Sequence, residues 1–316
     1  MWCDLTLLPL DNPPMLLQTS RFRIDLTAPK VMGIVNVTPD SFSDGGDHAS
    51  AGAAMRHCEQ LLRDGADILD IGGESTRPGA MALTLEEELR RVLPVMRHAV
   101  TLGVPVSVDT YKPAVMRAVL DLGADIVNDI WALRWRDRPD GLSGAAVVAG
   151  HASCAVCLMH MHRDPQSMQV APMEGDVAAQ VLSFLELRTQ YLRGLGVDSS
   201  RICVDPGIGF GKTVAQNFAL LARQAELLAL GYPVLAGWSR KSSLAAVSAT
   251  SLSSVASMAV QDRLAPSVTA AVLSVQNGAG IVRVHDVKET VQALKVLAAM
   301  QAQRGATMNT TTTTER

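Results

Sequence analysis

The chain has 316 residues, a length that suits one large α/β domain, because single α/β barrels reach about 250 residues and more. Hydrophobic residues make up 48% of the sequence and aromatic residues only 4%, so the core must consist mainly of aliphatic side chains. A net charge of -3 without a long run of one sign argues against bulk electrostatic binding to nucleic acid or to an anionic membrane.

One pattern recurs along the chain: a helical stretch ends in Gly, a short β-branched run follows, and a polar residue ends the run. The Gly adopts the left-handed conformation that ends a helix, and the run is a strand buried on both faces. The pattern occupies residues 65–70, 103–109, 123–128, 150–160, 196–205, 231–237 and 280–285, and residues 31–36 provide a first strand. Eight strands that alternate with helices, without hairpin signals, predict an α/β fold, a single-domain (β/α)8 TIM barrel, rather than an open doubly wound sheet.

Helices are expected at residues 50–64, 84–102, 113–122, 141–149, 176–193, 213–230, 267–276 and 287–303. No linker interrupts residues 31–303, so these residues are expected to form one catalytic domain. Residues 1–30 form an N-terminal extension, in which residues 21–26 are expected to cap the bottom of the barrel. The polar, threonine-rich residues 304–316 are expected to be a disordered tail.

The five cysteines indicate a reducing compartment. They are odd in number and scattered, which favours free thiols over a disulfide framework. The chain starts without a basic signal region, and none of its segments reaches transmembrane length. The sequence therefore predicts a cytoplasmic protein.

Two pairs of residues have spacings that resemble metal sites. Cys154 and Cys157 lie three apart in an apolar run, so on a strand they point to opposite faces and are unsuited to share a metal. His160 and His162 lie two apart and share a face, but no third ligand stands at a zinc-like spacing. We therefore favour one histidine in the strand layer and one in the loop.

Polar side chains end nearly every expected strand. The active site of a parallel barrel lies at the carboxyl ends of its strands. These ends carry Asn36, Asp70 with Glu74, Asp109, Asn128, His160, Asp205, Ser239 with Lys241, and Arg283 with His285. Each residue alone could be a helix cap or a turn residue. Eight converging polar ends favour a binding mouth.

These side chains fall into two chemical groups. Acceptors and an amide, suited to a flat heterocycle with N–H and amino groups, come from Asp109, Asn128 and Asp205. Donors and positive charge, suited to an anion such as pyrophosphate, come from Arg77, Lys241, Arg283 and His285. The predicted substrate therefore carries a nitrogen heterocycle at one end and a phosphate group at the other.

The glycine-rich segment before Lys212 invites comparison with a phosphate-binding P-loop. A P-loop has four residues between its first Gly and the Gly-Lys pair, whereas only three separate Gly207 from Gly211. The position one earlier is Pro206, which lacks the N–H that such a loop requires. We interpret the glycines as letting the backbone pass close beneath a ligand, with Phe210 packed nearby.

Seven motifs, among them GGESTRPG at residues 72–79 and DPGIGFGK at residues 205–212, resemble the signatures of the dihydropteroate synthase family of pterin-binding enzymes. The others occupy residues 31–46, 107–110, 128–130, 239–242 and 283–287. The resemblance implies a transferase of folate biosynthesis that condenses 6-hydroxymethyl-7,8-dihydropterin pyrophosphate with p-aminobenzoate to give 7,8-dihydropteroate and pyrophosphate. It also implies Mg²⁺ as cofactor, these small molecules as partners, a homodimer and a target of sulfonamides.

The resemblance also assigns roles to individual residues. The pterin would be held by Asp109, Asn128, Asp205 and Lys241, with Met159 and Phe210 near its ring. The pyrophosphate would be received by Asn36, Thr76, Arg77, Arg283 and His285, and Asn36 would help to hold the Mg²⁺. The p-aminobenzoate site would be shaped by Thr76, Arg77, Pro78 and Ser239. Catalysis would fall to Arg77, Asp109, Lys241, Arg283 and His285.

The chain departs from the family pattern at several positions, none of which removes a proposed ligand. Arg163 stands where the family often has Gly, Tyr111 stands where it often has a small residue, and residues 248–260 are unusually long and serine-rich. These differences bear on the shape of the p-aminobenzoate entrance and on the helix surface where the family dimerises.

Two other functions remain open from the sequence. A pterin-dependent methyltransferase acting on methyltetrahydrofolate would share the barrel, but it has no reason to keep Ser239 and Lys241 in their motif. A noncatalytic pterin-binding paralogue should have lost loop residues such as Asn36 and Arg77, and both are present.

Overall fold

Eight parallel strands close into a barrel in the computed structural model, which describes residues 15–37, 46–75, 81–138, 140–249 and 258–311. The strand order around the barrel is β10-β3-β4-β5-β6-β7-β8-β9. The strands are β3 (Lys30–Asn36), β4 (Ile68–Gly72), β5 (Val106–Asp109), β6 (Ile126–Asp129), β7 (Ala155–Met159), β8 (Ile202–Asp205), β9 (Val234–Ala236) and β10 (Ala279–Val284). The prediction of a single-domain (β/α)8 TIM barrel is confirmed.

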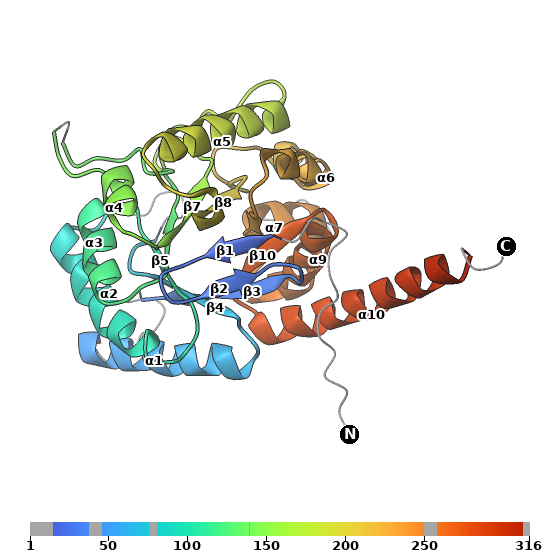
Figure 1. Cartoon of the computed structure of the whole chain (residues 1–316), viewed down its shortest axis with the longest axis horizontal. Coiled ribbons are helices and arrows are strands. Elements are labelled where there is room, and N and C mark those ends of the chain that lie inside the picture. The colour runs from blue at the N-terminus through green and yellow to red at the C-terminus, as the bar shows by residue number, and fades with distance from the viewer. Residues whose placement is uncertain (1–14, 38–45, 76–80, 139, 250–257, 312–316) are drawn as a thin grey trace.

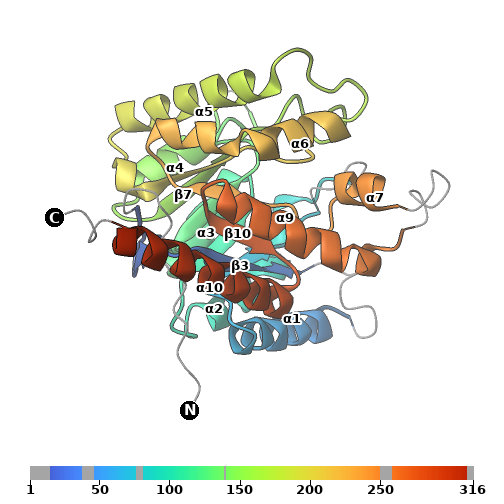
Figure 2. The ribbon, with the colours of Figure 1, turned by 90° about the vertical axis from the view of Figure 1, so that its right-hand side faces the viewer.

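Helices surround the strands, with α1 to α4 on one side of the barrel and α5 and α6 on another (Figure 1, Figure 2). They are α1 (Gly46–Arg63), α2 (Leu85–Ala99), α3 (Pro113–Asp121), α4 (Gly144–Gly150), α5 (Val177–Gly194), α6 (Val214–Ala222), α7 (Ser242–Ser248), α9 (Leu264–Gln276) and α10 (Val287–Thr311), with the short 3₁₀ segments η2 (Ser199–Arg201), η3 (Gln224–Leu230) and η4 (Val260–Arg263). Helix α10 continues past the domain boundary expected at residue 303, and that boundary remains a prediction.

One expected helix is divided in two. The sequence predicted a single helix over residues 213–230, whereas α6 ends at Ala222 and continues as η3. Gln224 at the junction is buried, and its Nε2 donates to the carbonyls of Ser274 at 2.8 Å and Asn277 at 3.2 Å. These bonds attach the junction to the end of α9, so a contact distant in sequence interrupts the regular helix. Helix α7 was not expected from the sequence.

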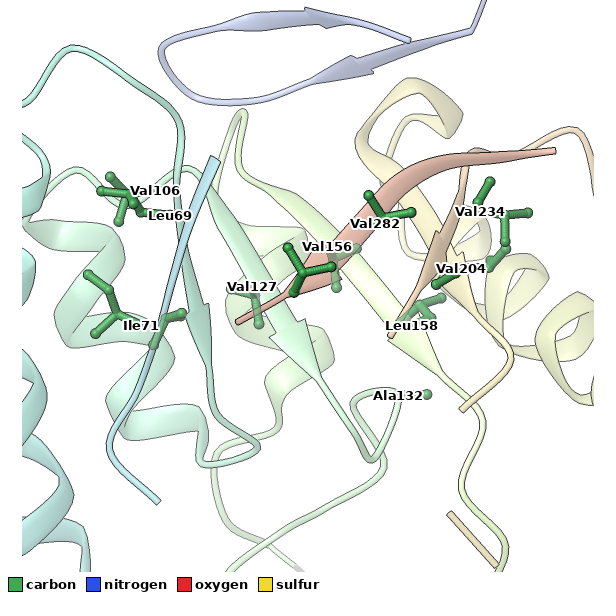
Figure 3. Close-up of a cluster of buried hydrophobic side chains, with 14 of the residues drawn as sticks. Leu69, Ile71, Val106, Val127, Ala132, Val156, Leu158, Val204, Val234 and Val282 are labelled. Atoms are coloured by element: carbon green, nitrogen blue, oxygen red, sulfur yellow. The ribbon is translucent and has the colours of Figure 1, made fainter. Parts of the chain in front are cut away.

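The strands alternate between two hydrophobic environments. Outward residues such as Leu69, Val127 and Val204 lie in the large core between the strands and the helices (Figure 3). Inward residues near the amino ends of the strands, such as Ile68 and Ile281, form a second cluster inside the barrel. Because neighbouring residues of a strand face opposite sides, the inward row continues to Asp70 on β4, Asn128 on β6, Asp205 on β8 and Arg283 on β10. The alternation thus directs the polar ends toward the mouth.

A short antiparallel hairpin, β1 (Leu16–Gln18) and β2 (Arg23–Asp25), contributes to the inner cluster. Its residues Leu17 and Ile24 are buried together with the inward residues of the amino ends of the strands. Arg21 attaches the hairpin to the barrel through a 2.6 Å ion pair with Asp125. Asp125 is fully buried, and its Oδ2 also accepts the backbone N–H of Val106 at 2.9 Å.

Candidate active site

A hydrogen-bonded cluster links inward residues of four strands at the mouth of the barrel. Arg283, on β10, donates from Nε to Asp70 Oδ2 and from Nη2 to Asp109 Oδ2, both at 2.6 Å. Asn128 donates from Nδ2 to the same Asp70 oxygen at 3.2 Å. Asp109 and Asn128 are direct neighbours across β5 and β6. Residues up to 213 positions apart in sequence therefore form one hydrogen-bonded group.

The environment of this group changes its ionisation. Burial raises the pKa of Asp109 to about 7, although Arg283 lowers it and the nearby Asp70 carboxylate raises it further. Burial works against the charge of Arg283, but Asp70 and Asp109 outweigh it, so the pKa of Arg283 lies above its ordinary value. Among the described residues, Asp70 Oδ1 is buried without a hydrogen-bond partner. The mouth therefore holds the permanently charged Arg283, and Asp70 Oδ1 beside it can still accept a hydrogen bond.

A second group lies on β8 and the segment after it. Asp205 is 6% exposed, and its Oδ1 accepts the backbone N–H of Gly207 at 2.7 Å. Burial raises the pKa of Asp205, while the positive charge of Lys241 opposes this rise. Lys241 Nζ lies 4.8 Å from the centroid of the Phe210 ring and donates to the carbonyl of Ile208. Met159 stands beside Asp205 in the register of β7 and β8 and is buried. An acceptor, a cation and apolar side chains thus meet at one place.

The glycines after β8 approach other parts of the chain closely, and the expected approach to a ligand remains a prediction. Gly207, Gly209 and Gly211 all have positive φ, at 69°, 83° and 72°. A Cβ at Gly207 would lie 1.8 Å from the His160 carbonyl oxygen, and one at Gly211 would lie 2.6 Å from the Cβ of His162. The tightest approach that requires glycine is therefore to the segment after β7. A Cβ at Gly207 or Gly209 would also lie 3.3 Å from a predicted site residue, Cγ of Met159 or Cδ of Lys241.

Ser239 and His285 form a pair after β9 and β10. Ser239 Oγ lies 2.9 Å from Nδ1 of His285 and also accepts the backbone N–H of His285 at 3.1 Å. Arg240 and Asp286, next to them in sequence, form an ion pair of 2.5 Å. The two strand ends are therefore fastened to each other, which places the predicted Ser239 and His285 together.

A buried ionic cluster lies beside these groups. Lys112 contacts Glu74 and also Glu88, the latter at 2.6 Å. Tyr111 donates its hydroxyl to Glu74 at 2.8 Å, and Thr110, directly after Asp109, donates to Glu88 at 2.5 Å. The cluster borders a cavity of about 220 Å³, which is also lined by Ile130, Trp131 and Trp135. Tyr111, which stands where the family often has a small residue, thus bonds Glu74, two positions before the predicted site residue Thr76.

Most of the predicted site residues lie within the described part of the chain. Asn36, Asp109, Asn128, Met159, Asp205, Phe210, Ser239, Lys241, Arg283 and His285 all lie at or just after the carboxyl ends of strands. Thr76, Arg77 and Pro78 lie outside the described residues. The sequence did not assign a role to Asp70, although it ends an expected strand, because its partner Arg283 comes from the far end of the chain.

The described residues contain no group of three or more His, Cys, Asp and Glu side chains that could hold a metal ion. His160 is buried, burial lowers its pKa to about 2, and its Nδ1 lies 3.0 Å from Nζ of Lys212. Cys157 is buried in the inner cluster, whereas Cys154 lies in the outer one. Neither spacing that resembled a metal site therefore forms one.

Barrel and mouth together define the class of protein: an α/β barrel whose mouth holds buried carboxyl and amide groups beside the cations Arg283 and Lys241. The family model described as pterin binding enzyme matches residues 32–285. A dihydropteroate synthase of Neisseria meningitidis serogroup B is 46% identical over 288 residues, which cover 90% of this chain and 96% of that protein.

Two solved structures extend the comparison. Dihydropteroate synthase of Xanthomonas albilineans with 4-aminobenzoic acid has a TM-score of 0.82 at 47% identity, covering 92% of this chain and 99% of that one. The Burkholderia cenocepacia enzyme complexed with 7,8-dihydropteroate has a TM-score of 0.81 at 45% identity, covering 93% and 99%. The chain belongs to the dihydropteroate synthase family of pterin-binding enzymes.

Proposed function

We propose that this chain condenses 6-hydroxymethyl-7,8-dihydropterin pyrophosphate with p-aminobenzoate to give 7,8-dihydropteroate and pyrophosphate, as a transferase of folate biosynthesis. The observation that carries the proposal is the convergence of Asp109, Asn128, Asp205, Lys241 and Arg283 at one mouth. The complexes of related enzymes with 4-aminobenzoic acid and with 7,8-dihydropteroate support the same substrates here.

The pterin is recognised by the inward acceptors. Asp205 has one oxygen bonded to Gly207 and a second oxygen that can accept from the N–H and amino groups of the pterin. Asn128 can both donate and accept at the neighbouring position. Met159 and Phe210 supply apolar contact with the ring, and Lys241 offers a donor from above Phe210. Asn128, Met159 and Asp205 are fixed by strands, while Phe210 lies in the hydrogen-bonded segment after β8 and Lys241 is bonded to it, so little reorganisation is needed when the ligand binds.

The reaction then depends on stabilising the leaving group. Arg283 keeps its charge because two carboxylates surround it, and its side chain is 20% exposed. His285 lies two residues further along the chain, and Arg77 is assigned to the same pyrophosphate together with Thr76. As the methylene carbon–oxygen bond breaks, these groups bind the developing charge on pyrophosphate, and the aniline nitrogen of p-aminobenzoate attacks the carbon. Neither step requires a covalent enzyme intermediate.

The side-chain oxygen atoms at the mouth are of the kind that binds Mg²⁺. This ion commonly takes one or two protein oxygens and completes its shell with substrate phosphates and water. Asn36 ends β3 with an amide oxygen at the mouth, and we assign it as the protein ligand. When bound, the ion would neutralise charge on the departing pyrophosphate.

p-Aminobenzoate is assigned to Ser239 together with Thr76, Arg77 and Pro78. Ser239 is 8% exposed and is held by His285, so the second substrate would lie next to the pyrophosphate groups. Sulfonamides would compete for this position. The presence of Ser239 and Lys241 at one mouth favours this synthase over a methyltransferase or a noncatalytic paralogue.

We also propose that the protein works as a cytoplasmic homodimer, as expected from the family resemblance. None of the helices within the described ranges is long and apolar enough to cross a membrane. Sedimentation of the purified protein at several concentrations would measure its state of association.

The deciding experiment incubates purified protein with the pterin pyrophosphate, p-aminobenzoate and Mg²⁺, and measures dihydropteroate and pyrophosphate in equal amounts. Absence of both products at saturating substrates would reject the catalytic proposal. Pterin binding without turnover would favour the noncatalytic paralogue instead.

A further inference from the structure

The loop between β8 and α6 is held by an unusual number of hydrogen bonds. All five carbonyl oxygens from Gly207 to Gly211 accept one. The donors are Lys212 Nζ to Gly207 at 2.8 Å and to Phe210 at 3.1 Å, Lys241 Nζ to Ile208, Gln169 Nε2 to Gly209 at 2.7 Å, and the backbone N–H of Met173 to Gly211 at 2.9 Å. A loop whose carbonyls are all bonded is restricted to one conformation.

Lys212 makes the central bonds of this network. Its side chain is buried, with the residue 3% exposed, and its ammonium bonds the Gly207 and Phe210 carbonyls and His160 Nδ1 at 3.0 Å. The His160 carbonyl lies at 3.4 Å as a fourth acceptor, so these partners use all three donors of an ammonium. Since the pKa of His160 is strongly lowered by burial, its ring is neutral and can accept at Nδ1. The lysine that looks like a phosphate ligand in the sequence therefore fastens its own loop.

Three of the groups assigned to the pterin depend on this loop. Asp205 Oδ1 is bonded to the N–H of Gly207. Phe210 is part of the loop, with its carbonyl held by Lys212. Lys241 lies over the Phe210 ring and is bonded to the loop at Ile208. The position of the loop consequently determines where an acceptor, a ring and a cation stand at the mouth.

We propose that Lys212 is a positioning residue for pterin binding, which fixes the loop of residues 206–212 so that Phe210 and Lys241 stand ready beside Asp205. This inference rests on the proposed function. Lys212 acts through the loop and touches neither substrate. Without its ammonium, His160 Nδ1 and the His160 carbonyl lose this donor, and the carbonyls of Gly207 and Phe210 keep only the backbone N–H groups of Phe210 at 3.1 Å and His162 at 3.5 Å, so the loop relaxes. A displacement of about 1 Å in binding groups can reduce function by about a hundred-fold.

The chain offers a matched control on the same strand. Arg201 directly precedes β8 at its opposite end, is 7% exposed and, like Lys212, has backbone carbonyls as partners. These are Cys154 at 2.7 Å, Val148 and His151 at 2.9 Å, and Ala152 at 3.3 Å. Arg201→Met and Lys212→Met each remove a buried cation held by carbonyls. Only Lys212 borders the pterin groups.

The experiment first measures the Kd of wild-type protein for the pterin pyrophosphate by titration calorimetry, and then that of Lys212→Met, Lys212→Gln and Arg201→Met. Thermal unfolding of each ligand-free protein measures its stability. For Lys212→Met we expect a Kd raised about ten- to a hundred-fold, with the KM for p-aminobenzoate at saturating pterin changed less than about two-fold. Lys212→Gln keeps one donor group and should lie between wild type and Lys212→Met. Arg201→Met should lose stability and keep its Kd.

A double-mutant cycle tests whether Lys212 acts through Phe210. If it does, Lys212→Met should weaken pterin binding much less in a Phe210→Leu background than in wild type. Strictly additive effects would overturn the inference, as would a Lys212→Met protein that loses stability like Arg201→Met but keeps the wild-type Kd. Failure of both Lys212 variants to fold would also overturn it, because Lys212 would then serve folding. A wild-type protein that does not bind the pterin would instead reject the proposed function.

Discussion

At the amino ends of the strands most inward side chains are apolar, whereas at the carboxyl ends most are charged or amide groups and Met159 is the apolar exception. Met32, Ile68 and Ile281 are fully buried at the first end, beneath the hairpin. Asp109 and Arg283 stand at the other. The inward-facing residues of a strand therefore supply apolar side chains to the hairpin end of the barrel and polar side chains to the mouth.

The two ends also differ in how completely their buried charges are bonded. Asp125, at the hairpin end, accepts from Arg21 and Thr19 with one oxygen and from Arg21 and Val106 with the other. Asp70, at the mouth, has one oxygen bonded by Arg283 and Asn128 and, among the described residues, the other without a partner. An unsatisfied buried acceptor costs stability. The hairpin end contributes to folding, while the mouth retains bonding capacity that a ligand can use.

The largest effect should come from Arg283→Met compared with Arg21→Met, because each removes an arginine from a buried aspartate. Arg283→Met leaves Asp70 and Asp109 without a cation and removes a donor to pyrophosphate, so turnover should fall by at least about a hundred-fold. Arg21→Met should lower stability by about 3 kcal/mol and leave turnover per folded molecule unchanged. Product assays and thermal unfolding measure both. Equal loss of turnover in the two variants would contradict the assignment of folding to the hairpin end and of ligand binding to the mouth.

Asp205→Asn should have the next largest effect. It keeps the shape of the side chain but turns one acceptor toward the pterin into a donor, and each unpaired buried group costs about 1 to 3 kcal/mol. The Kd for the pterin should rise roughly ten- to three-hundred-fold, with little change in melting temperature. Asp67→Asn is the control, since Asp67 Oδ2 accepts the N–H of Val31 at 2.8 Å at the other end. If Asp205→Asn mainly lowered the melting temperature, Asp205 would be a structural turn residue.

Lys241 should make pterin binding depend on pH. Burial lowers its pKa to about 8, so above this pH its charge is lost and pterin affinity should weaken. Stability should change in the opposite direction: between pH 8 and the ordinary lysine pKa of 10.5 the unfolded chain binds more protons, so this residue makes stability rise with pH. Titrations from pH 7 to about 10 with wild type and Lys241→Met test this. A wild-type pH dependence that persists in Lys241→Met would assign it to another group.

The smallest effect should come from Ile281→Val, which shortens a fully buried side chain at the hairpin end. Loss of one methylene group there should cost about 1 kcal/mol of unfolding free energy. The Kd for the pterin and the turnover should equal those of wild type. Chemical denaturation with a parallel product assay measures both, and reduced turnover at full folding would show that the two ends are coupled.

The strand ends could be predicted from sequence because local rules determine them. A strand alternates its faces, so Asn128 and Asp205 must face inward when the apolar residues beside them face the helices. Closure of eight such units then brings the ends together. The same local rules explain why the barrel itself was predicted correctly.

Contacts distant in sequence could not be predicted in this way. The bonds of Arg283 to Asp70 and of Gln224 to the end of α9 depend on closure of the barrel and on packing between helices. The tight neighbour of Gly207 was also not predictable, because it is the carbonyl of His160, 47 positions earlier in the sequence. Periodicity gives the direction of a side chain but not its partner.

The pairing of β10 with β3 has a consequence for how the chain must be synthesised. Strand β3 is the first strand of the barrel, and its partner β10 starts only at Ala279. The barrel can therefore close only after nearly the whole polypeptide has left the ribosome. Until then β3 and β9 both present open edges, and such edges pair readily with other chains. Premature termination before residue 279 would therefore yield a fragment prone to aggregation, with Arg283 and His285 missing, rather than a smaller enzyme.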